Sequence, residues 1–140
     1  MPHDQSFAFL RRALLLDATA SGATGLLLIA GAGLLEGLLG LPAAILRGAG
    51  LLLLPYVACV AFTGTRAALA PPAVRAIIAA NLLWAAASVA LLASGWVAPT
   101  ALGYAFVIAQ AAVVALLGEL QYVGVRRPVA GPKRGVSYGG

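Results

Sequence analysis

Residues 13–35 read ALLLDATASGATGLLLIAGAGLL, an apolar run that carries a single charge, Asp17, near its start. The run is close to the roughly 20 residues that a helix needs to cross a hydrocarbon core about 30 Å thick. A cleavable export signal has a shorter, uninterrupted apolar core of about 7–15 residues. The stretch therefore predicts an uncleaved first membrane helix that contains an acidic side chain.

The composition supports a membrane location. Of 140 residues, 62% are hydrophobic and 9% are charged, whereas a soluble domain has roughly 25% charged residues. A chain this short cannot bury so much apolar surface away from water. The net charge of +5 does not indicate a nucleic-acid partner, because the cations lie at the ends of the apolar runs.

Three further apolar runs follow the first, and they are too continuous for barrel strands, which alternate over about 10 residues. We predict an all-α fold, an integral membrane four-helix bundle over residues 13–125 with up-down-up-down order. A polar leader at 1–12 and a basic flexible tail at 126–140 flank the bundle. The expected spans are 13–35, 46–65, 75–96 and 100–123.

The basic residues predict the orientation of this bundle. In a four-span arrangement, Arg47 is the only basic residue on one side of the membrane. The other eight basic residues lie on the opposite side: Arg11, Arg12, Arg66, Arg75, Arg126, Arg127, Lys133 and Arg134. Cytoplasmic loops of membrane proteins carry an excess of Lys and Arg. Both termini are therefore expected in the cytoplasm.

Small residues indicate how the helices pack, since close approach drives helix association in lipid. The first run contains three small-xxx-small pairs: Ala18/Gly22, Ser21/Gly25 and Gly33/Gly37. In the second run Pro55 is expected to kink the helix, because proline removes one backbone hydrogen bond.

Asp17 is expected near the cytoplasmic end of its helix, about 7.5 Å beyond Arg12. Because Ser21 and Thr24 follow at helical spacing, they share a face with Asp17. A candidate ion-pair cluster at this depth contains Asp17, Ser21, Thr24, Arg66, Arg75 and Glu119. We interpret Asp17 as a structural anchor; the alternative is that Asp17 and Glu119 carry protons or cations, as intramembrane carboxylates often do.

A second set of polar side chains lies deeper in the predicted spans: Tyr56, Asn81, Ser88 and Gln110. They are expected to join helices by hydrogen bonds or to line a ligand pocket.

The C-terminal tail carries four cations. Arg126, Arg127, Lys133 and Arg134 are expected to contact lipid headgroups, and each contact contributes about 1 kcal/mol.

The sequence contains no pattern typical of an enzyme, a metal site or a cofactor site. Cys59 and His3 are single residues of their type, so no metal-ligand spacing exists. No glycine-rich phosphate loop precedes a Lys-Ser/Thr pair. We therefore expect no enzymatic activity, no metal and no cofactor.

Four stretches, LDATASGATGLLL, LLGLPAAILRGAG, NLLWAAASVALL and PTALGYAFVIAQA, resemble a family of uncharacterised small four-helix inner-membrane proteins from GC-rich bacteria. The resemblance covers about residues 14–127 and implies a multi-pass protein of the bacterial inner membrane with no assigned activity. Small multidrug exporters share the size and an acid in the first helix, but LLLDATASG does not match their pattern.

These features predict an accessory or interaction subunit of a membrane complex. Its expected partners are membrane lipids and another membrane protein or a second copy of the chain. Two alternatives stay open: a small transporter or channel for a proton-coupled or small polar solute, and a membrane protein that binds a lipid, quinone or pigment.

Overall fold

The computed structural model describes residues 2–126, with no description of the side chains of residues 2–4 and 6. Within this range the chain is helical and contains no strand. Its helices are α1 (Pro2–Ala30), α2 (Ala32–Leu39), α3 (Ala43–Thr65), α4 (Pro71–Ala93) and α5 (Ala101–Arg126). The expected tail cations Arg127, Lys133 and Arg134 lie outside the described residues.

Four of these helices are long and apolar enough to cross a membrane: Phe7–Ala30, Ala43–Thr65, Pro71–Ala93 and Ala101–Arg126. The predicted all-α class and the four apolar helices are confirmed. Many large apolar side chains point outward, and Leu52 and Leu83 are 67% and 71% exposed. Soluble proteins rarely expose apolar surface on this scale, whereas lipid tails cover it without penalty.

Several boundaries differ from the predicted spans: α3 begins at Ala43 rather than 46, α4 covers Pro71–Ala93 rather than 75–96, and α5 ends at Arg126 rather than 123. Helix α1 begins at Pro2, so most of the expected leader is helical. The predicted first span 13–35 is divided at Gly31, where the chain bends between α1 and α2. The amide of Gly31 still donates to Leu27 O at 2.8 Å, so the bend interrupts the helix without exposing that backbone group.

Glycine and proline set the connections between helices. Gly40 ends α2 with φ +67°, a left-handed conformation that favours glycine. A Cβ at Gly40 would also lie 2.8 Å from Ala98 O, so both the backbone and the available space require glycine. Pro42 precedes α3, and α4 begins at Pro71, where proline suits the first helical turn.

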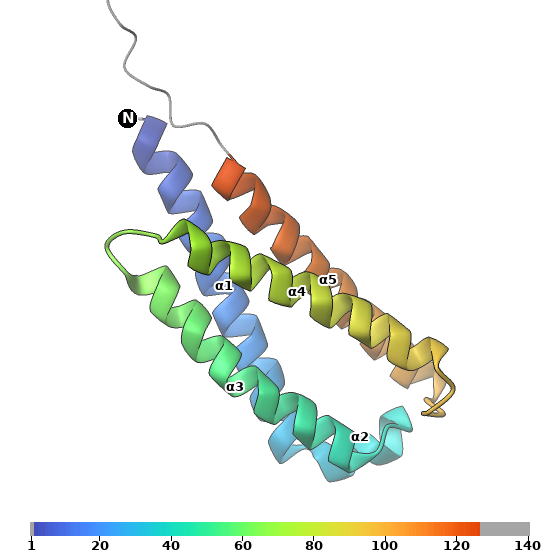
Figure 1. The fold of residues 1–140 in the computed structure, drawn as a ribbon. Coiled ribbons are helices and arrows are strands. Elements are labelled where there is room, and N and C mark those ends of the chain that lie inside the picture. Colours follow the sequence, from blue (N-terminus) through green and yellow to red (C-terminus); the bar gives the residue numbers. More distant parts are fainter. Residues whose placement is uncertain (1, 127–140) are drawn as a thin grey trace, which may run out of the picture.

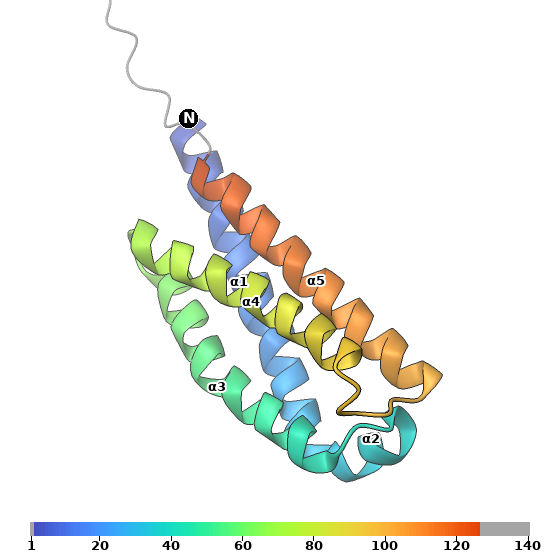
Figure 2. The same cartoon turned by 45° about the vertical axis from the view of Figure 1, so that its right-hand side comes forward.

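Figures 1 and 2 show α4 and α5 side by side, while α3 diverges from α4 beyond the loop that joins them. Helix α1 packs mainly on α3, and it also contacts α5. Glycine permits the α1–α3 crossing, because a Cβ at Gly50 would lie 2.8 Å from Gly25 O. Helices α3 and α4 barely contact each other.

Contacts at the two ends of the molecule fix which helix ends lie together. At one end, Arg11 donates to Gly64 O and Arg66 O at 2.7 and 2.8 Å, and Gly124 packs against Leu10. The start of α1 therefore lies beside the ends of α3 and α5 (Figure 1). At the other end, Thr100 N donates to Leu39 O at 2.9 Å, which joins α2 to the α4–α5 loop.

Candidate functional site

The carboxylate of Asp17 is fully buried, with an exposed fraction of 0%. Four side chains donate hydrogen bonds to it, one from each of the four long helices. Their donor–acceptor distances are 3.0 Å from Ser21 Oγ, 2.7 Å from Tyr56 Oη, 2.8 Å from Asn81 Nδ2 and 2.6 Å from Gln121 Nε2. We call these five residues the Asp17 network.

Hydrogen bonds also run between the donors of this network. Asn81 Nδ2 donates to Gln121 Oε1 at 3.1 Å, so one amide serves two acceptors. The Tyr56 hydroxyl lies 2.7 Å from Asp17 Oδ2 and 2.8 Å from Asn81 Oδ1. Because a hydroxyl has one proton, it donates to one of these oxygens at a time. The network therefore couples α1, α3, α4 and α5 through a single buried carboxylate.

The expected ion pairs of Asp17 are not formed among the described residues. Neutral side chains donate hydrogen bonds to its carboxylate instead. The guanidinium of Arg66 lies over the ring of Phe62, 4.8 Å from the centroid. Arg75 is exposed and precedes Asn81 by six residues, about 9 Å along α4. Both arginines thus lie nearer the helix ends than the carboxylate does.

Glu119 and Thr24, also expected in this cluster, lie apart from Asp17. Glu119 is exposed and lies two positions before the buried Gln121, which is a rotation of about 200° around the helix. The Thr24 hydroxyl donates to Ala20 O on its own helix at 2.8 Å. Of the predicted cluster, the structure brings only Ser21 to Asp17.

A second polar cluster joins α4 to α5 and contains Trp84, Ser88 and Gln110. Trp84 Nε1 donates to Gln110 Oε1 at 2.9 Å, and Gln110 Nε2 donates to Ser88 Oγ at 2.9 Å. The indole N–H can only donate, so it fixes the orientation of the Gln110 amide. As expected, Asn81 and Gln110 each link helices, but they do so in separate clusters.

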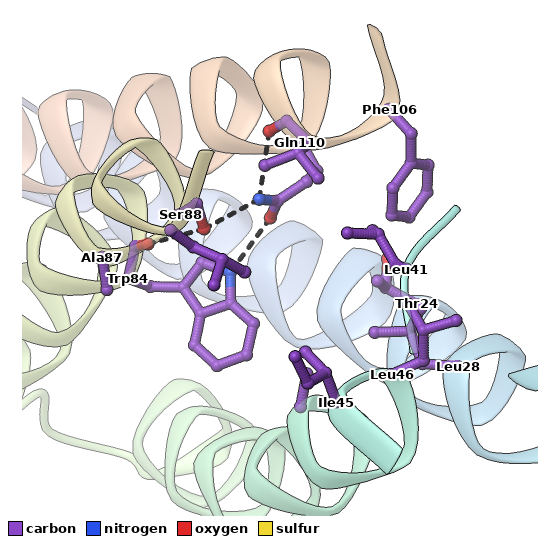
Figure 3. A pocket seen from close by; sticks show the side chains of 13 residues that line it. Thr24, Leu28, Leu41, Ile45, Leu46, Trp84, Ala87, Ser88, Phe106 and Gln110 are labelled. Carbon is purple, nitrogen blue, oxygen red and sulfur yellow. Dashed lines mark hydrogen bonds between the residues drawn. The ribbon is translucent and has the colours of Figure 1, made fainter. Parts of the chain in front are cut away.

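Between the four long helices lies a cleft of about 560 Å³. Its walls are mostly apolar, and its polar lining residues are Ser21, Thr24, Tyr56, Asn81, Trp84 and Gln110. A smaller cavity of about 180 Å³ adjoins it (Figure 3) and shares four of its lining residues: Thr24, Trp84, Ala87 and Gln110. We refer to both spaces together as the α3–α4 cleft, because these two helices barely touch and leave it open between them.

Two residues of the site, Gln121 and Trp84, were not predicted as site residues. Gln121 lies between Gly118 and Gly124 at intervals of three residues, and all three are buried. Small residues at this spacing mark a helix face that a neighbour approaches closely. That spacing is the sequence signal for the position of Gln121.

Arg126, expected to contact lipid headgroups, lies at the end of α5. Its guanidinium donates to Tyr122 Oη at 2.7 Å and lies 5.2 Å from the centre of the same ring. Both side chains are exposed, so this pair is directed toward the surroundings of the bundle.

Comparison with known proteins adds no family assignment. No family model matches the sequence, and no curated protein and no solved structure is significantly similar to it. The resemblance to small four-helix inner-membrane proteins stays a prediction, and the function is inferred from the site.

Proposed function

We propose that this chain is a multi-pass membrane protein that binds a small lipid-soluble molecule in the α3–α4 cleft. The observation that carries the proposal is a space of about 560 Å³ between four apolar helices, with a few polar groups in its wall. Ligand sites typically measure about 300–1,000 Å³ and combine apolar walls with a small number of placed polar groups. This is the last of the three functions that the sequence left open.

In this proposal the Asp17 network shapes the cleft. Tyr56 on α3 and Asn81 on α4 both donate to Asp17 and also line the cleft. Because α3 and α4 make few direct contacts, their hydrogen bonds to Asp17 and the contact between Tyr56 and Asn81 set the distance between them at this depth. Asp17 is thus a structural anchor, as its sequence context indicates, and its partners are neutral.

The proposed bundle has up-down-up-down order, with both termini in the cytoplasm of a bacterium and the helices in its inner membrane. Two observations support this: the eight-to-one distribution of basic residues and the shared end of α1, α3 and α5. The test uses a Cys59→Ser background, since Cys59 is the only cysteine. With a membrane-impermeant maleimide on intact cells, Ser94→Cys is expected to react and Ala68→Cys to react only after lysis.

Tryptophan fluorescence tests ligand binding directly. Trp84 lines the cleft, whereas Trp96 is 86% exposed, and these are the only two tryptophans. In a Trp96→Phe variant, Trp84 alone reports on the cleft. A long-chain alcohol with bromine atoms in mid-chain is expected to quench Trp84 fluorescence saturably in mild detergent.

A matched pair of variants separates binding in the cleft from contact with the detergent micelle. Ala87 lines the cleft, so Ala87→Phe is expected to fill it and abolish the saturable component. Ala86 is exposed and lies outside the lining, so Ala86→Phe should leave that component unchanged. Quenching that is linear in every variant contradicts the proposal.

An accessory subunit is the second candidate, and exposed glycines favour it. A Cβ added at Gly33, Gly37 or Gly48 would meet nothing within 4 Å, so these small residues serve no packing within the chain. They leave room for a helix of a partner or of a second copy. Mild-detergent extraction followed by mass spectrometry tests this candidate. A stoichiometric partner that is lost in Gly37→Leu would support it. Recovery of the unsubstituted protein without a partner would contradict it.

A further inference from the structure

Every polar hydrogen on the side chains that line the α3–α4 cleft is already used within the protein. The hydroxyl of Tyr56 and the amide of Asn81 donate inside the Asp17 network. The indole N–H of Trp84 donates to Gln110 Oε1. The amide of Gln110 donates to Ser88 Oγ and to Val107 O, at 2.9 and 3.1 Å. Both hydrogens of each amide thus have acceptors.

The hydroxyl groups of the three smaller polar residues in the cleft wall also donate hydrogen bonds within the protein. Ser21 Oγ donates to Asp17 Oδ1 at 3.0 Å. Thr24 Oγ1 donates to Ala20 O, and Ser88 Oγ donates to Trp84 O, each at 2.8 Å. The cleft therefore offers a ligand no side-chain donor from the described residues that line it.

Acceptor capacity remains in the same wall. A hydroxyl oxygen and an amide oxygen each have two lone pairs. Thr24 Oγ1 accepts no hydrogen bond from a described residue, and Gln110 Oε1 accepts only one, from Trp84. Both residues line both parts of the cleft, so the two oxygens with spare acceptor capacity belong to side chains that the two spaces share.

We propose that the cleft selects a neutral long-chain molecule with a hydroxyl group over the ketone, ester or ether of the same size. This inference rests on the proposed function and specifies its ligand class. A ligand hydroxyl can donate to Thr24 Oγ1 or Gln110 Oε1. A carbonyl or ether oxygen in the same place finds only acceptors, and a buried polar group without a partner is unfavourable.

The same reasoning predicts the relative affinities of related ligands. A quinol donates through its hydroxyl groups, whereas the corresponding quinone only accepts, so the reduced form is expected to bind more tightly. An ionised carboxylate has no hydrogen-bond donor and also carries a charge into an apolar space. Fatty acids in their ionised form are therefore expected to be excluded from the cleft.

The test compares two probes that differ only in the donor. A mid-chain brominated alcohol and its methyl ether are titrated against the Trp96→Phe protein in the same detergent, with Trp84 quenching as the readout. One net hydrogen bond corresponds to about a fivefold difference in affinity. The alcohol is expected to reach half-saturation at about fivefold lower concentration than the ether.

Two matched threonines test whether the preference comes from the cleft. Thr24→Val removes one of the two acceptors with free lone pairs at the cleft. Thr19→Val removes a hydroxyl that donates to Leu15 O at 2.8 Å on the same helix but lies outside the cleft. Each variant loses only a bond within α1, so both are expected to unfold at similar temperatures. Thr24→Val should reduce the alcohol preference, and Thr19→Val should keep it.

The outcomes separate the two proposals. Saturable quenching with equal affinity for alcohol and ether, or a preference for the ether, overturns the ligand class and leaves the binding function standing. An alcohol preference that survives in Thr24→Val alone assigns the hydrogen bond to Gln110 Oε1 and supports the ligand class. A preference that survives in the double variant Thr24→Val with Gln110→Met, which has neither acceptor, overturns this inference. Absence of saturable quenching by either probe overturns both the inference and the proposed function.

Discussion

Gln121 on α5 donates its side-chain amide to Asp17 on α1 at 2.6 Å, across 104 positions of sequence. Both residues have an exposed fraction of 0%. Buried polar groups in native structures are hydrogen-bonded, and here the two groups satisfy each other from the first and last helices. Because Tyr56 and Asn81 donate to the same carboxylate, the bond belongs to a junction of all four long helices.

The first prediction concerns loss of this acceptor. Asp17→Ala leaves Ser21, Asn81 and Gln121 without their shared acceptor, whereas Tyr56 can still donate to Asn81 Oδ1. Each buried donor left unsatisfied costs about 1–3 kcal/mol. We expect a loss of at least about 3 kcal/mol in the free energy of unfolding. Asp17→Asn keeps one oxygen, so its loss should be smaller. Thermal unfolding in mild detergent measures both effects.

Glu119→Ala is the control for this prediction, because it removes an exposed acid from the same end of the bundle and should have little effect. An unchanged unfolding temperature in Asp17→Ala would contradict the role of the junction. If Asp17→Asn proved as harmful as Asp17→Ala, the network would depend on the charge of residue 17 rather than on an acceptor oxygen.

The second prediction concerns the donor on the other side of this bond. Gln121→Glu places a second carboxylate within hydrogen-bond distance of Asp17, where both are shielded from water. An uncompensated buried charge costs about 3–5 kcal/mol, so we expect the largest destabilisation of any single change in the network. The double variant Asp17→Asn with Gln121→Glu restores one carboxylate and one amide, and it should recover part of the lost stability.

The double variant decides whether the two residues act on each other directly. Recovery beyond the sum of the single effects would give a coupling free energy between positions 17 and 121. A double variant no more stable than Gln121→Glu alone would show that the direct bond is not the source of the destabilisation. Tyr122→Phe, an exposed neighbour, controls for nonspecific effects at this end of α5.

The four apolar helices were predictable because the physical requirement is simple. A segment that spans a bilayer must be apolar over about 20 residues, and this can be read from composition alone. Local chemistry shifted the boundaries: Pro42 precedes the start of α3, and the chain bends at Gly31. Such effects move a helix end by a few residues without changing the number of apolar helices.

The partners of Asp17 were harder to predict, because apolar residues surround each helix. A soluble helix shows its buried face as a stripe, but Leu and Ala occupy lipid-facing and interior positions alike in this chain. The sequence indicates the depth of Asp17 and leaves open which face of each neighbour meets it. Charge complementarity favoured Arg66 and Arg75, whereas helix rotation brought Asn81 and Gln121 to the carboxylate.

The third prediction tests the close approach of α1 and α3. A Cβ at Gly50 would lie 2.8 Å from Gly25 O and from Ile29 Cγ1, so Gly50→Ala must separate the two helices or distort them. Overpacking of this kind typically costs about 1–3 kcal/mol. Detergent unfolding measures the loss.

Gly48 supplies the matched control on the same helix. A Cβ at Gly48 meets nothing within 4 Å, and alanine in a helix interior is up to about 1 kcal/mol more favourable than glycine. Gly48→Ala should therefore be neutral or slightly stabilising. Similar effects of the two substitutions would indicate that helix propensity, rather than the α1–α3 contact, determines the result.

The fourth prediction concerns Arg11 and Arg12, two adjacent arginines that have the same expected role in membrane orientation. Arg11 donates to Gly64 O at 2.7 Å and Arg66 O at 2.8 Å, where the last carbonyl groups of α3 have no partner within the helix. Arg12 is exposed. Each Arg→Met change removes one positive charge from the same end of α1, so any effect on membrane orientation should be shared. Only Arg11→Met is expected to destabilise the protein, by about 1–2 kcal/mol after allowance for partial exposure. Equal unfolding temperatures for the two variants would show that Arg11 contributes to membrane orientation and not to stability.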